Sequence, residues 1–537
     1  MRSFKKIFAF LMVVGFLFIL ASCGSKSGVI ANMEYTASTT KIKITATFAE
    51  NEHLKDKTAT VSIKEYGYAD DNSEVFKEQK SLSFSNDIYT KADVVEFSGL
   101  TKNTKYLYKL YVTFEGYAEE ITTLEATTSN AGDTDDDAIA ITTVDDFNSI
   151  GSNPSAHYVL KNDLDFSNMT LDAGLTSSNM FKGSFDGGNY TIKNLKLTSS
   201  NTALFTYTKD ATIKNLKIDN VSADYSTGRS NASIGALLGK AEGTIVKDVT
   251  ITNVDFKVKG NSSAIIDCGA VTGLAITSTF ENVNASNVTI EFTQARYKTN
   301  VGLFAGQLGD NNRSVGKTTY DGNEVTLLAG KCFASGTIKT TLYTSSDGYT
   351  HIGGFSGDIS SPSLVFDSYS DANITVTKNV TVNNDVVTTD SVKSHIAIGG
   401  FTGCNNTGSM NIKKCLANAS IIAYAGNQDY AEKAKDDLFT TSTTDNKYYT
   451  HIGGFIGVVR PVIANVTDCI YKPVGDGVKV YALDTQKIDD VDVKVLFTDN
   501  TIAENKDKDT KVTNLVEWND SLSIDGFGEV VKGFLNK

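Results

Sequence analysis

Two of the five histidines in this chain lie in copies of one short sequence, Tyr-Thr-His-Ile-Gly-Gly-Phe, and could act together as metal ligands. They are His351 and His451. Neutral imidazole is a common ligand of zinc and other transition metals. The copy between them reads Ala-Ile-Gly-Gly-Phe and has Ala397 in the histidine position. If the copies stack as repeats, at least one repeat separates the two imidazoles. We therefore predict no shared metal site and no cofactor.

Carboxylates could act as calcium ligands or as acid–base groups. Three of them have the spacing of the first ligands in a calcium loop: Asp133, Asp135 and Asp137. Such a loop needs glycine at its sixth position and an acid at its twelfth. The chain has Ala138 and Val144 there, so we interpret residues 129–138 as an acidic linker.

Sequence motifs of catalysis are missing from the chain. It contains no HExxH, CxxC, P-loop or GxSxG sequence, and each of these marks a defined chemistry. Asp186 lies in the sequence Phe-Asp-Gly-Gly-Asn, whose residue types are typical of a turn. The remaining acids are scattered along the chain. We predict no catalytic residues.

The first 23 residues have the pattern of an export signal. A positive start precedes an apolar run at 7–20, which is shorter than the roughly 20 residues that span a bilayer and typical of a signal-peptide core. The run ends in Leu-Ala-Ser-Cys, which resembles the lipobox of bacterial lipoproteins. The resemblance implies that residues 1–22 are a lipoprotein signal peptide and that Cys23 carries a diacylglycerol. Residues 23–28 would then be a lipidated tether that holds the protein on the extracytoplasmic face of the cell membrane.

Composition limits the partners and the redox chemistry. The net charge is −13, which argues against a nucleic-acid partner, because phosphates require a basic surface. Five cysteines remain after Cys23, too few for a disulfide scaffold. We expect them to pack as small apolar side chains.

Residues 29–128 contain short runs in which apolar and polar residues alternate, such as 40–50 and 105–116. This period-two pattern is typical of half-buried strands. Runs of this length, about seven in 100 residues, predict an immunoglobulin-like β-sandwich.

One stretch of this region, 99–117, resembles the end of the fibronectin type III pattern, in which a leucine, a turn and a threonine precede a tyrosine. Here these are Leu100, Thr104 and Tyr106. The resemblance implies that Tyr106 makes the tyrosine-corner hydrogen bond. The tryptophan usual in the early strands of that family is missing, since the single tryptophan is Trp518.

From residue 139 the chain becomes self-similar. A Gly-x-x-x-Gly pattern with a central aliphatic or aromatic residue recurs at 235–239, 269–273, 302–306, 353–357, 399–403 and 453–457. Units that cannot bury their apolar face alone must stack, so the repeats predict a solenoid. We expect glycine to permit positive-φ bends and the phenylalanines to stack inside. The structural residues of the last three copies are Gly353, Phe355, Gly357, Gly399, Phe401, Gly403, Gly453, Phe455 and Gly457.

The sequence Tyr-Val-Leu-Lys-Asn-Asp-Leu-Asp-Phe, the block Phe-Lys-Gly-Ser-Phe-Asp-Gly-Gly-Asn-Tyr-Thr-Ile and the repeated Gly-Gly-Phe-x-Gly resemble the GLUG-type repeat proteins of bacterial surfaces. The resemblance covers roughly 139–480. It implies a right-handed parallel β-helix, a surface or adhesin-like setting and no catalytic residues.

We therefore predict an all-β protein with a fibronectin type III-like sandwich, a parallel β-helix at 139–497 and a C-terminal cap at 498–537. The predicted function is a non-catalytic, adhesin-like surface lipoprotein. It would be held to the membrane by its lipid and would present the β-helix to an extracellular glycan or protein ligand. The alternative is a carbohydrate-active β-helix enzyme, a polysaccharide lyase or hydrolase. Three or more carboxylates clustered on one face would favour that alternative.

Overall fold

The computed structural model describes residues 31–48, 59–69, 72–82, 93–114, 119–226, 231–260, 264–293, 298–309, 317–320, 323–343, 348–360, 363–379, 382–383, 386–387, 394–405, 410–425, 450–459, 464–471, 479–483, 511–517 and 527–535. The predicted signal peptide, Cys23 and Trp518 lie outside these residues. The chain forms two compact units, Met1–Ile139 and Ala140–Lys537. Among the described residues, no helix is long and apolar enough to cross a membrane.

The first unit is a β-sandwich, as the alternating runs predict. One antiparallel sheet has the order β1 (Ala31–Ala37), β2 (Lys41–Phe48) and β5 (Asp93–Ser98). The other has the order β4 (Glu74–Leu82), β3 (Ala59–Tyr68), β6 (Lys105–Phe114) and β7 (Glu120–Thr127). Alternate side chains of β2 are buried, because successive residues of a strand face opposite sides of its sheet.

The acidic segment 129–138 is tied to this sandwich. It contains a short 3-10 helix, Asp135–Asp137. The Asp137 carboxylate accepts hydrogen bonds from the amide and the hydroxyl of Thr39, both at 2.9 Å, and from the hydroxyl of Ser129. Burial raises the pKa of Asp137, but these hydrogen bonds outweigh it and hold the pKa below its ordinary value.

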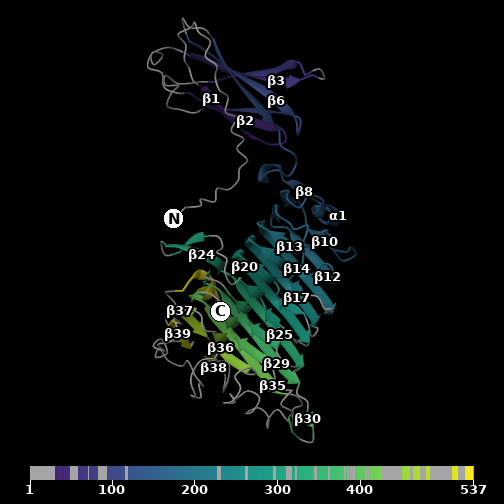
Figure 1. Ribbon diagram of the computed structural model, residues 1–537, viewed down its shortest axis with the longest axis vertical. Helices are drawn as coiled ribbons and strands as arrows, with labels where there is room; N and C mark the ends of the chain where they lie inside the picture. The colour runs from purple at the N-terminus through teal and green to yellow at the C-terminus, as the bar shows by residue number, and fades with distance from the viewer. Residues whose placement is uncertain are drawn as a thin grey trace. The chain divides into compact units, whose positions relative to one another are not determined.

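The second unit is a parallel β-helix, and the all-β prediction is confirmed (Figure 1). Its larger sheet pairs equivalent strands of successive turns. They are β8 (Ile139–Ile141), β9 (Tyr158–Leu160), β10 (Leu164–Asp165), β11 (Ser184–Asp186), β12 (Thr191–Leu197), β14 (Thr212–Ser226), β17 (Ile245–Lys259), β20 (Thr279–Thr293), β24 (Asn323–Gly330), β25 (Phe333–Tyr343), β28 (Ser363–Phe366), β29 (Tyr369–Asn379), β34 (Met410–Lys413), β35 (Leu416–Ala425), β37 (Ala464–Tyr471) and β39 (Lys511–Glu517). One outlying strand, β23 (Lys317–Tyr320), pairs antiparallel with β24.

The other sheet holds the strands on either side of each Gly-x-x-x-Gly copy. Those before it are β15 (Ala232–Ile234), β18 (Ile265–Cys268), β21 (Lys298–Gly302), β26 (Gly348–Gly353) and β32 (Ser394–Gly399). Those after it, with a preceding β13 (Phe205–Lys209), are β16 (Leu238–Glu242), β19 (Thr272–Ile276), β22 (Ala305–Leu308), β27 (Ser356–Ile359) and β33 (Thr402–Asn405). β36 (Thr450–Val459) joins the two series, and β38 (Lys479–Leu483) pairs with it. The described part of this unit also contains the short α-helices α1 (Val144–Asn148) and α3 (Glu529–Leu535).

Most bends of the β-helix lie at asparagine and aspartate, and glycine with positive φ makes only some of them, such as Gly243 after β16 and Gly309 after β22, so the prediction that glycine makes the bends holds only in part. In β14, β17 and β20 two positions five residues apart have positive φ. The first column is Asn215, Asp248 and Asn282, and the second is Asn220, Asn253 and Asn287. Asparagine and aspartate tolerate the left-handed region better than other non-glycine residues. The amides also form a ladder, in which Asn287 Nδ2 donates to Asn253 Oδ1 at 2.5 Å.

The repeat glycines have a different role, which is close backbone approach. A Cβ on Gly403 would lie 2.5 Å from the Ile352 amide nitrogen, and one on Gly399 would lie 1.9 Å from the Thr402 carbonyl oxygen. Gly353 and Gly357 are equally crowded. Any side chain at these positions would push the strands on either side of the repeat apart.

Aromatic rings stack inside the β-helix. Phe304, Phe355, Phe401 and Phe455 are fully buried. The centroids of successive rings are 4.5, 4.9 and 5.2 Å apart, and the ring planes are nearly parallel. Adjacent turns are separated by about the same distance, so each ring packs on the ring of the next turn. The thiols of five cysteines are buried and lie outside any disulfide: Cys268, Cys332, Cys404, Cys415 and Cys469.

Candidate functional site

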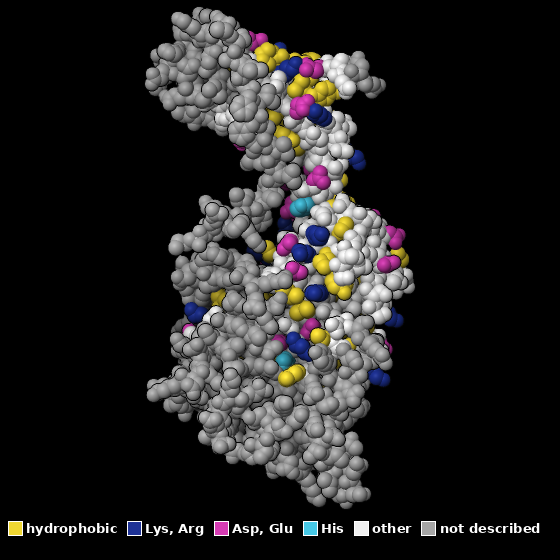
Figure 2. All heavy atoms as spheres, in the orientation of Figure 1, with side chains coloured by type: hydrophobic (Ala, Val, Ile, Leu, Met, Phe, Trp, Pro, Cys, Tyr) yellow, Lys and Arg dark blue, Asp and Glu magenta, His cyan; other side chains and the backbone are white. Residues whose placement is uncertain are grey.

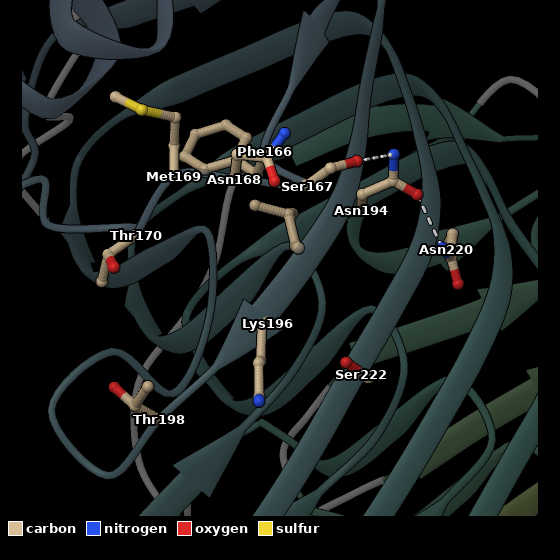
Figure 3. Close-up of a pocket in the computed structure, with 11 residues that line it drawn as sticks. Phe166, Ser167, Asn168, Met169, Thr170, Asn194, Lys196, Thr198, Asn220 and Ser222 are labelled. Atoms are coloured by element: carbon tan, nitrogen blue, oxygen red, sulfur yellow. Dashed lines mark hydrogen bonds between the residues drawn. The ribbon is translucent and has the colours of Figure 1, made fainter.

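An open hollow lies on the β-helix beside the first turns of the larger sheet (Figure 3). Its volume is about 630 Å³. The polar groups around it are mostly amides and hydroxyls, and three apolar side chains complete the lining. The lining residues are Phe166, Ser167, Asn168, Met169, Thr170, Asn194, Leu195, Lys196, Thr198, Asn220 and Ser222.

The asparagine ladder positions one wall of this hollow. Asn194 and Asn220 have φ of 61° and 55°, so the strand bends at both and the amides lie one above the other. Asn220 Nδ2 donates to Asn194 Oδ1 at 2.6 Å. Asn194 Nδ2 in turn donates to Asp165 Oδ1 at 2.7 Å and to the Ser167 hydroxyl at 2.8 Å. These hydrogen bonds use both N–H groups of Asn194 and hold the Asn220 amide in one orientation, so of the two amides only Asn220 keeps an N–H for a ligand.

Asp165 stays ionised at the edge of the hollow. Hydrogen bonds from the Ser167 hydroxyl, the Asn194 amide and the Ser167 backbone, with Lys193 3.5 Å away, hold the pKa of this carboxyl far below its usual range. A general acid needs a raised pKa, so Asp165 can accept hydrogen bonds but cannot supply a proton.

The opposite side of the hollow is partly apolar. Met169 is 42% exposed, and Phe166 and Leu195 lie buried beneath the surface. Lys196 is exposed and neighbours Ser222 in the next turn. Directional polar groups beside a small apolar surface are the usual lining of a ligand site, and amide and hydroxyl groups suit a ligand rich in hydroxyls.

A second polar cluster lies in the smaller sheet. Asp267, Asn300 and His351 occupy one register of β18, β21 and β26. His351 Nδ1 lies 2.9 Å from Asn300 Oδ1, which can only accept, so Nδ1 carries the proton. Asn300 Nδ2 donates to Asp267 Oδ1 at 2.7 Å. The groups form a continuous relay across three turns.

Asp358 joins this relay from β27. Its Oδ2 lies 3.6 Å from His351 Nδ1, and its Oδ1 accepts from the Ser360 hydroxyl at 2.7 Å. Lys298 Nζ and Asn300 Nδ2 both donate to Gln307 Oε1 on the adjoining strand, at 3.1 and 3.2 Å.

The two carboxyls of this cluster have opposite pKa shifts. Burial raises the pKa of Asp267 to about 6, against the attraction of Lys298. Burial also acts on Asp358, but the adjacent His351 and Lys298 and the Ser360 hydroxyl lower its pKa below the ordinary value. Pairs of carboxyls with separated pKa values serve as acid and base in many enzymes.

Solvent does not reach this cluster. Asp267 is 3% exposed, His351 1% and Asp358 0%. In the next turn Ala397 and Cys404 take the places of His351 and Asp358 and form a small apolar contact. The polar relay therefore ends against an apolar turn, and a substrate could meet it only after a local opening.

The residues that the sequence singled out, Tyr106 and the two histidines His351 and His451, lie in different parts of the chain. The Tyr106 hydroxyl accepts a hydrogen bond from the Thr101 amide at 2.8 Å. Strand pairing puts Ala397 between His351 and His451. In the part of the chain that the structure describes, no group of three His, Cys, Asp or Glu side chains could hold a metal ion.

Sequence reasoning missed Asp267, Asn300 and Asp358, although a signal for them exists. Asp267, Asn300 and His351 each stand two residues before the first glycine of a repeat, and Asp358 follows the last glycine of one. An alignment of the repeats on their glycines would have placed the first three in one column. The hollow had no such signal, because its lining comes from the ladder and from the irregular segment before β12.

Comparisons with known proteins give fold likenesses only. No protein-family model matches the chain, and no curated protein matches it. A Bacteroides ovatus structure, assigned provisionally as an immunoglobulin A1 protease, is 17% identical with a TM-score of 0.38 and covers 63% of this chain and 86% of its own. A Pectobacterium carotovorum pectate lyase is 10% identical and covers 91% and 99%. A Yersinia enterocolitica family 28 exopolygalacturonase is 8% identical and covers 92% and 99%, and both enzymes give a TM-score of 0.15.

These comparisons correct one prediction. We predicted that the chain is not an enzyme, and this is contradicted because two of the matched structures are enzymes by name. The low identities and TM-scores carry no argument about the substrate or the residues of this chain. By its own strand pairing, the chain is an all-β protein with an N-terminal β-sandwich and a parallel β-helix.

Proposed function

We propose that this chain is a lipid-anchored, extracytoplasmic β-helix protein that binds a polysaccharide in the hollow around Asn194 and Asn220. The lipid on Cys23 and the location outside the cytoplasm belong to the proposal and rest on the sequence of the first 23 residues.

The observation that carries the proposal is the lining of the hollow. Neighbouring turns present amides and hydroxyls at fixed heights, and the hydrogen bonds between Asn220, Asn194 and Asp165 orient them in advance. Preorganised polar groups lose little conformational entropy when a ligand binds. A sugar ring offers hydroxyls at its edge and C–H groups on its face, which match the asparagines and exposed Met169.

The test begins with a glycan array probed with the mature chain without its lipid. The best ligand is then measured by calorimetry against Lys196→Ala and Asn168→Ala. Both side chains are exposed and line the hollow, so both substitutions should weaken binding without unfolding the protein. Loss of one hydrogen bond to a neutral ligand should weaken binding roughly tenfold.

Lys257→Ala is the matched control. Lys257 is also an exposed lysine on the larger sheet, but it lies in β17 and does not line the hollow. If Lys257→Ala weakens binding as much as Lys196→Ala, the ligand meets the sheet through general charge. The hollow would then not be the site.

A second candidate function is cleavage of a polysaccharide. The hydrogen-bonded relay of Asp267, Asn300 and His351, with Asp358 beside it, favours this function, since these groups could act as acid and base after a local opening of the turns that bury them. Its test is the appearance of new reducing or unsaturated chain ends when the mature chain is incubated with its glycan. Asp267→Asn should abolish product while binding stays unchanged. Product that persists in Asp267→Asn and Asp358→Asn would remove this pair from the chemistry.

A further inference from the structure

A second cleft lies where the C-terminal helix covers the β-helix. Outward side chains of the larger sheet form a column, with Asn284, Phe333, Tyr369 and Leu416 in successive turns. The alternate residues Cys332 and Cys415 are buried inside. α3 packs on this column, and the buried cluster joins Tyr369, Leu416, Ile470, Phe527 and Val531.

A carboxylate of the β-helix holds the start of α3 in place. Asp367 Oδ1 accepts from the Val531 amide at 3.1 Å, and its Oδ2 accepts from the Val530 amide at 3.4 Å. Asp367 is itself buried, so these two contacts fix the helix over the aromatic column.

The cleft between α3 and the column has a volume of about 220 Å³. Phe333 and Tyr369 stack with centroids 4.9 Å apart and planes within 3°, and Phe534 packs on Tyr369 at 4.6 Å. Asn284 precedes Phe333 in the column, so the Phe333 face turned away from Tyr369 looks toward it. The lining residues are Asn284, Phe333, Tyr369, Glu529, Val530, Gly533 and Phe534.

The polar groups that line this cleft are hydrogen-bond acceptors. The Asn284 side-chain oxygen is buried and has no hydrogen-bond partner among the described residues, a state that costs free energy until a donor arrives. Glu529 adds a carboxylate, and none of the described residues that line the cleft is a lysine or arginine. A Cβ on Gly533 would meet nothing within 4 Å, so space remains above the rings.

We propose that this cleft binds an alkylammonium cation. Its charge would lie over the open face of Phe333, where the ring quadrupole attracts a cation, and near the Glu529 carboxylate. An N–H or polarised C–H of the cation would meet the Asn284 oxygen. This site is separate from the hollow and does not depend on the function proposed for it.

The experiment uses the mature full-length chain and two probes of nearly equal shape, choline and the neutral 3,3-dimethyl-1-butanol. Calorimetry and thermal unfolding should show binding and stabilisation by choline and none by the alcohol. Equal binding of the two probes, or no binding of either, overturns the proposal whatever the variants do.

Variants then locate the cation. Glu529→Gln removes the charge and Phe333→Leu removes the aromatic ring, and each should weaken choline binding roughly tenfold. Glu291→Gln, an exchange at the same sheet outside the cleft, should leave binding unchanged. Choline affinity that is equal in Glu529→Gln and the parent chain would contradict the site.

Two further arms identify the source of the cation. Phosphatidylcholine vesicles that bind the chain and are displaced by choline would assign the ligand to a lipid headgroup. Choline or n-butylammonium binding without vesicle binding would assign it to a soluble amine.

Discussion

At the scale of single residues, the buried carboxyl of Asp267 gives the protein a pH-dependent stability. Its pKa is raised in the folded state, to about 6, from about 3.9 in an unfolded chain. Such a group contributes stability that is complete below the unfolded pKa and is lost as the pH rises through the folded one. This stability is lost because the ionised Asp267 carboxylate is held away from water. The charge of Lys298 and the hydrogen bond from Asn300 offset only part of that cost.

Asp267→Asn should therefore stabilise the protein near pH 8 and have little effect near pH 4. The shift of about two pKa units corresponds to roughly 3 kcal/mol as an upper value, and the asparagine oxygen can still accept from Asn300. Denaturant unfolding of both chains at the two pH values measures the effect. An equal change in the free energy of unfolding at both would show that the carboxyl does not titrate in this range.

The repeat glycines make a second residue-scale prediction. Gly403→Ala would place a Cβ 2.5 Å from the backbone of the preceding turn, and overpacking of this kind typically costs about 1–3 kcal/mol. Gly533→Ala is the control, since its Cβ meets nothing within 4 Å and the position is helical. That change should stabilise by up to about 1 kcal/mol. If both substitutions change the free energy of unfolding in the same direction, close backbone approach is not the reason why glycine occupies the repeat positions.

The sequence predicted which side chains pack in the interior better than it predicted which polar residues lie together. The phenylalanine column was predictable, because its spacing within the repeat is regular. The asparagine bends were not, since we assigned positive φ to glycine, whereas glycine makes only some bends, such as Gly243 and Gly309, and Asn or Asp occupies most of the others. The relay of Asp267, Asn300 and His351 became visible only in the strand register.

At the scale of elements, each turn of the β-helix depends on the turns beside it. Phe401 stacks between Phe355 and Phe455 and is fully buried. Salt bridges across neighbouring turns, such as Lys247–Glu281 at 2.8 Å, are exposed and contribute little. Besides the backbone pairing of the strands, the interior rings therefore make the main side-chain contact between these turns.

Phe401→Ala should cost about 3–5 kcal/mol, because a cavity remains after the ring is removed. The damage should stay near the mutated turn, since each turn contacts only its neighbours. Limited proteolysis should then cut within residues 350–460 while the sandwich stays intact. Phe76→Ala, at a ring 54% exposed on β4, is the matched control and should change neither stability nor cleavage.

Elements were predictable where their pattern is periodic. Alternation located the sandwich strands, and the repeats located the β-helix. The placement of α3 could not be predicted from seven residues, because its position depends on Asp367 and an aromatic column more than 150 positions away in the chain.

At the scale of the whole molecule, acidic and basic side chains alternate over the described face of the β-helix unit (Figure 2). The chain as a whole carries a net charge of −13. Neither feature provides the continuous basic surface that phosphate backbones require. A neutral, hydroxyl-rich ligand fits such a surface without opposing its charge.

The membrane anchor is a prediction at the same scale. Cys23→Ala should abolish metabolic labelling with palmitate and prevent cleavage of the signal before residue 23, because the sulfur that receives the lipid is gone. Labelling is read on the protein purified from cells. Palmitate that remains on the variant would place the lipid elsewhere or exclude the anchor.

The most direct test of polysaccharide binding in the hollow is hydrogen–deuterium exchange of the mature chain with and without its glycan ligand. If the glycan binds in the hollow, exchange should slow in the peptides that carry the lining, residues 165–170, 194–198 and 220–222, while exchange in the sandwich stays unchanged. Protection of the sandwich alone, or of β-helix turns remote from these residues, would show that the glycan binds elsewhere.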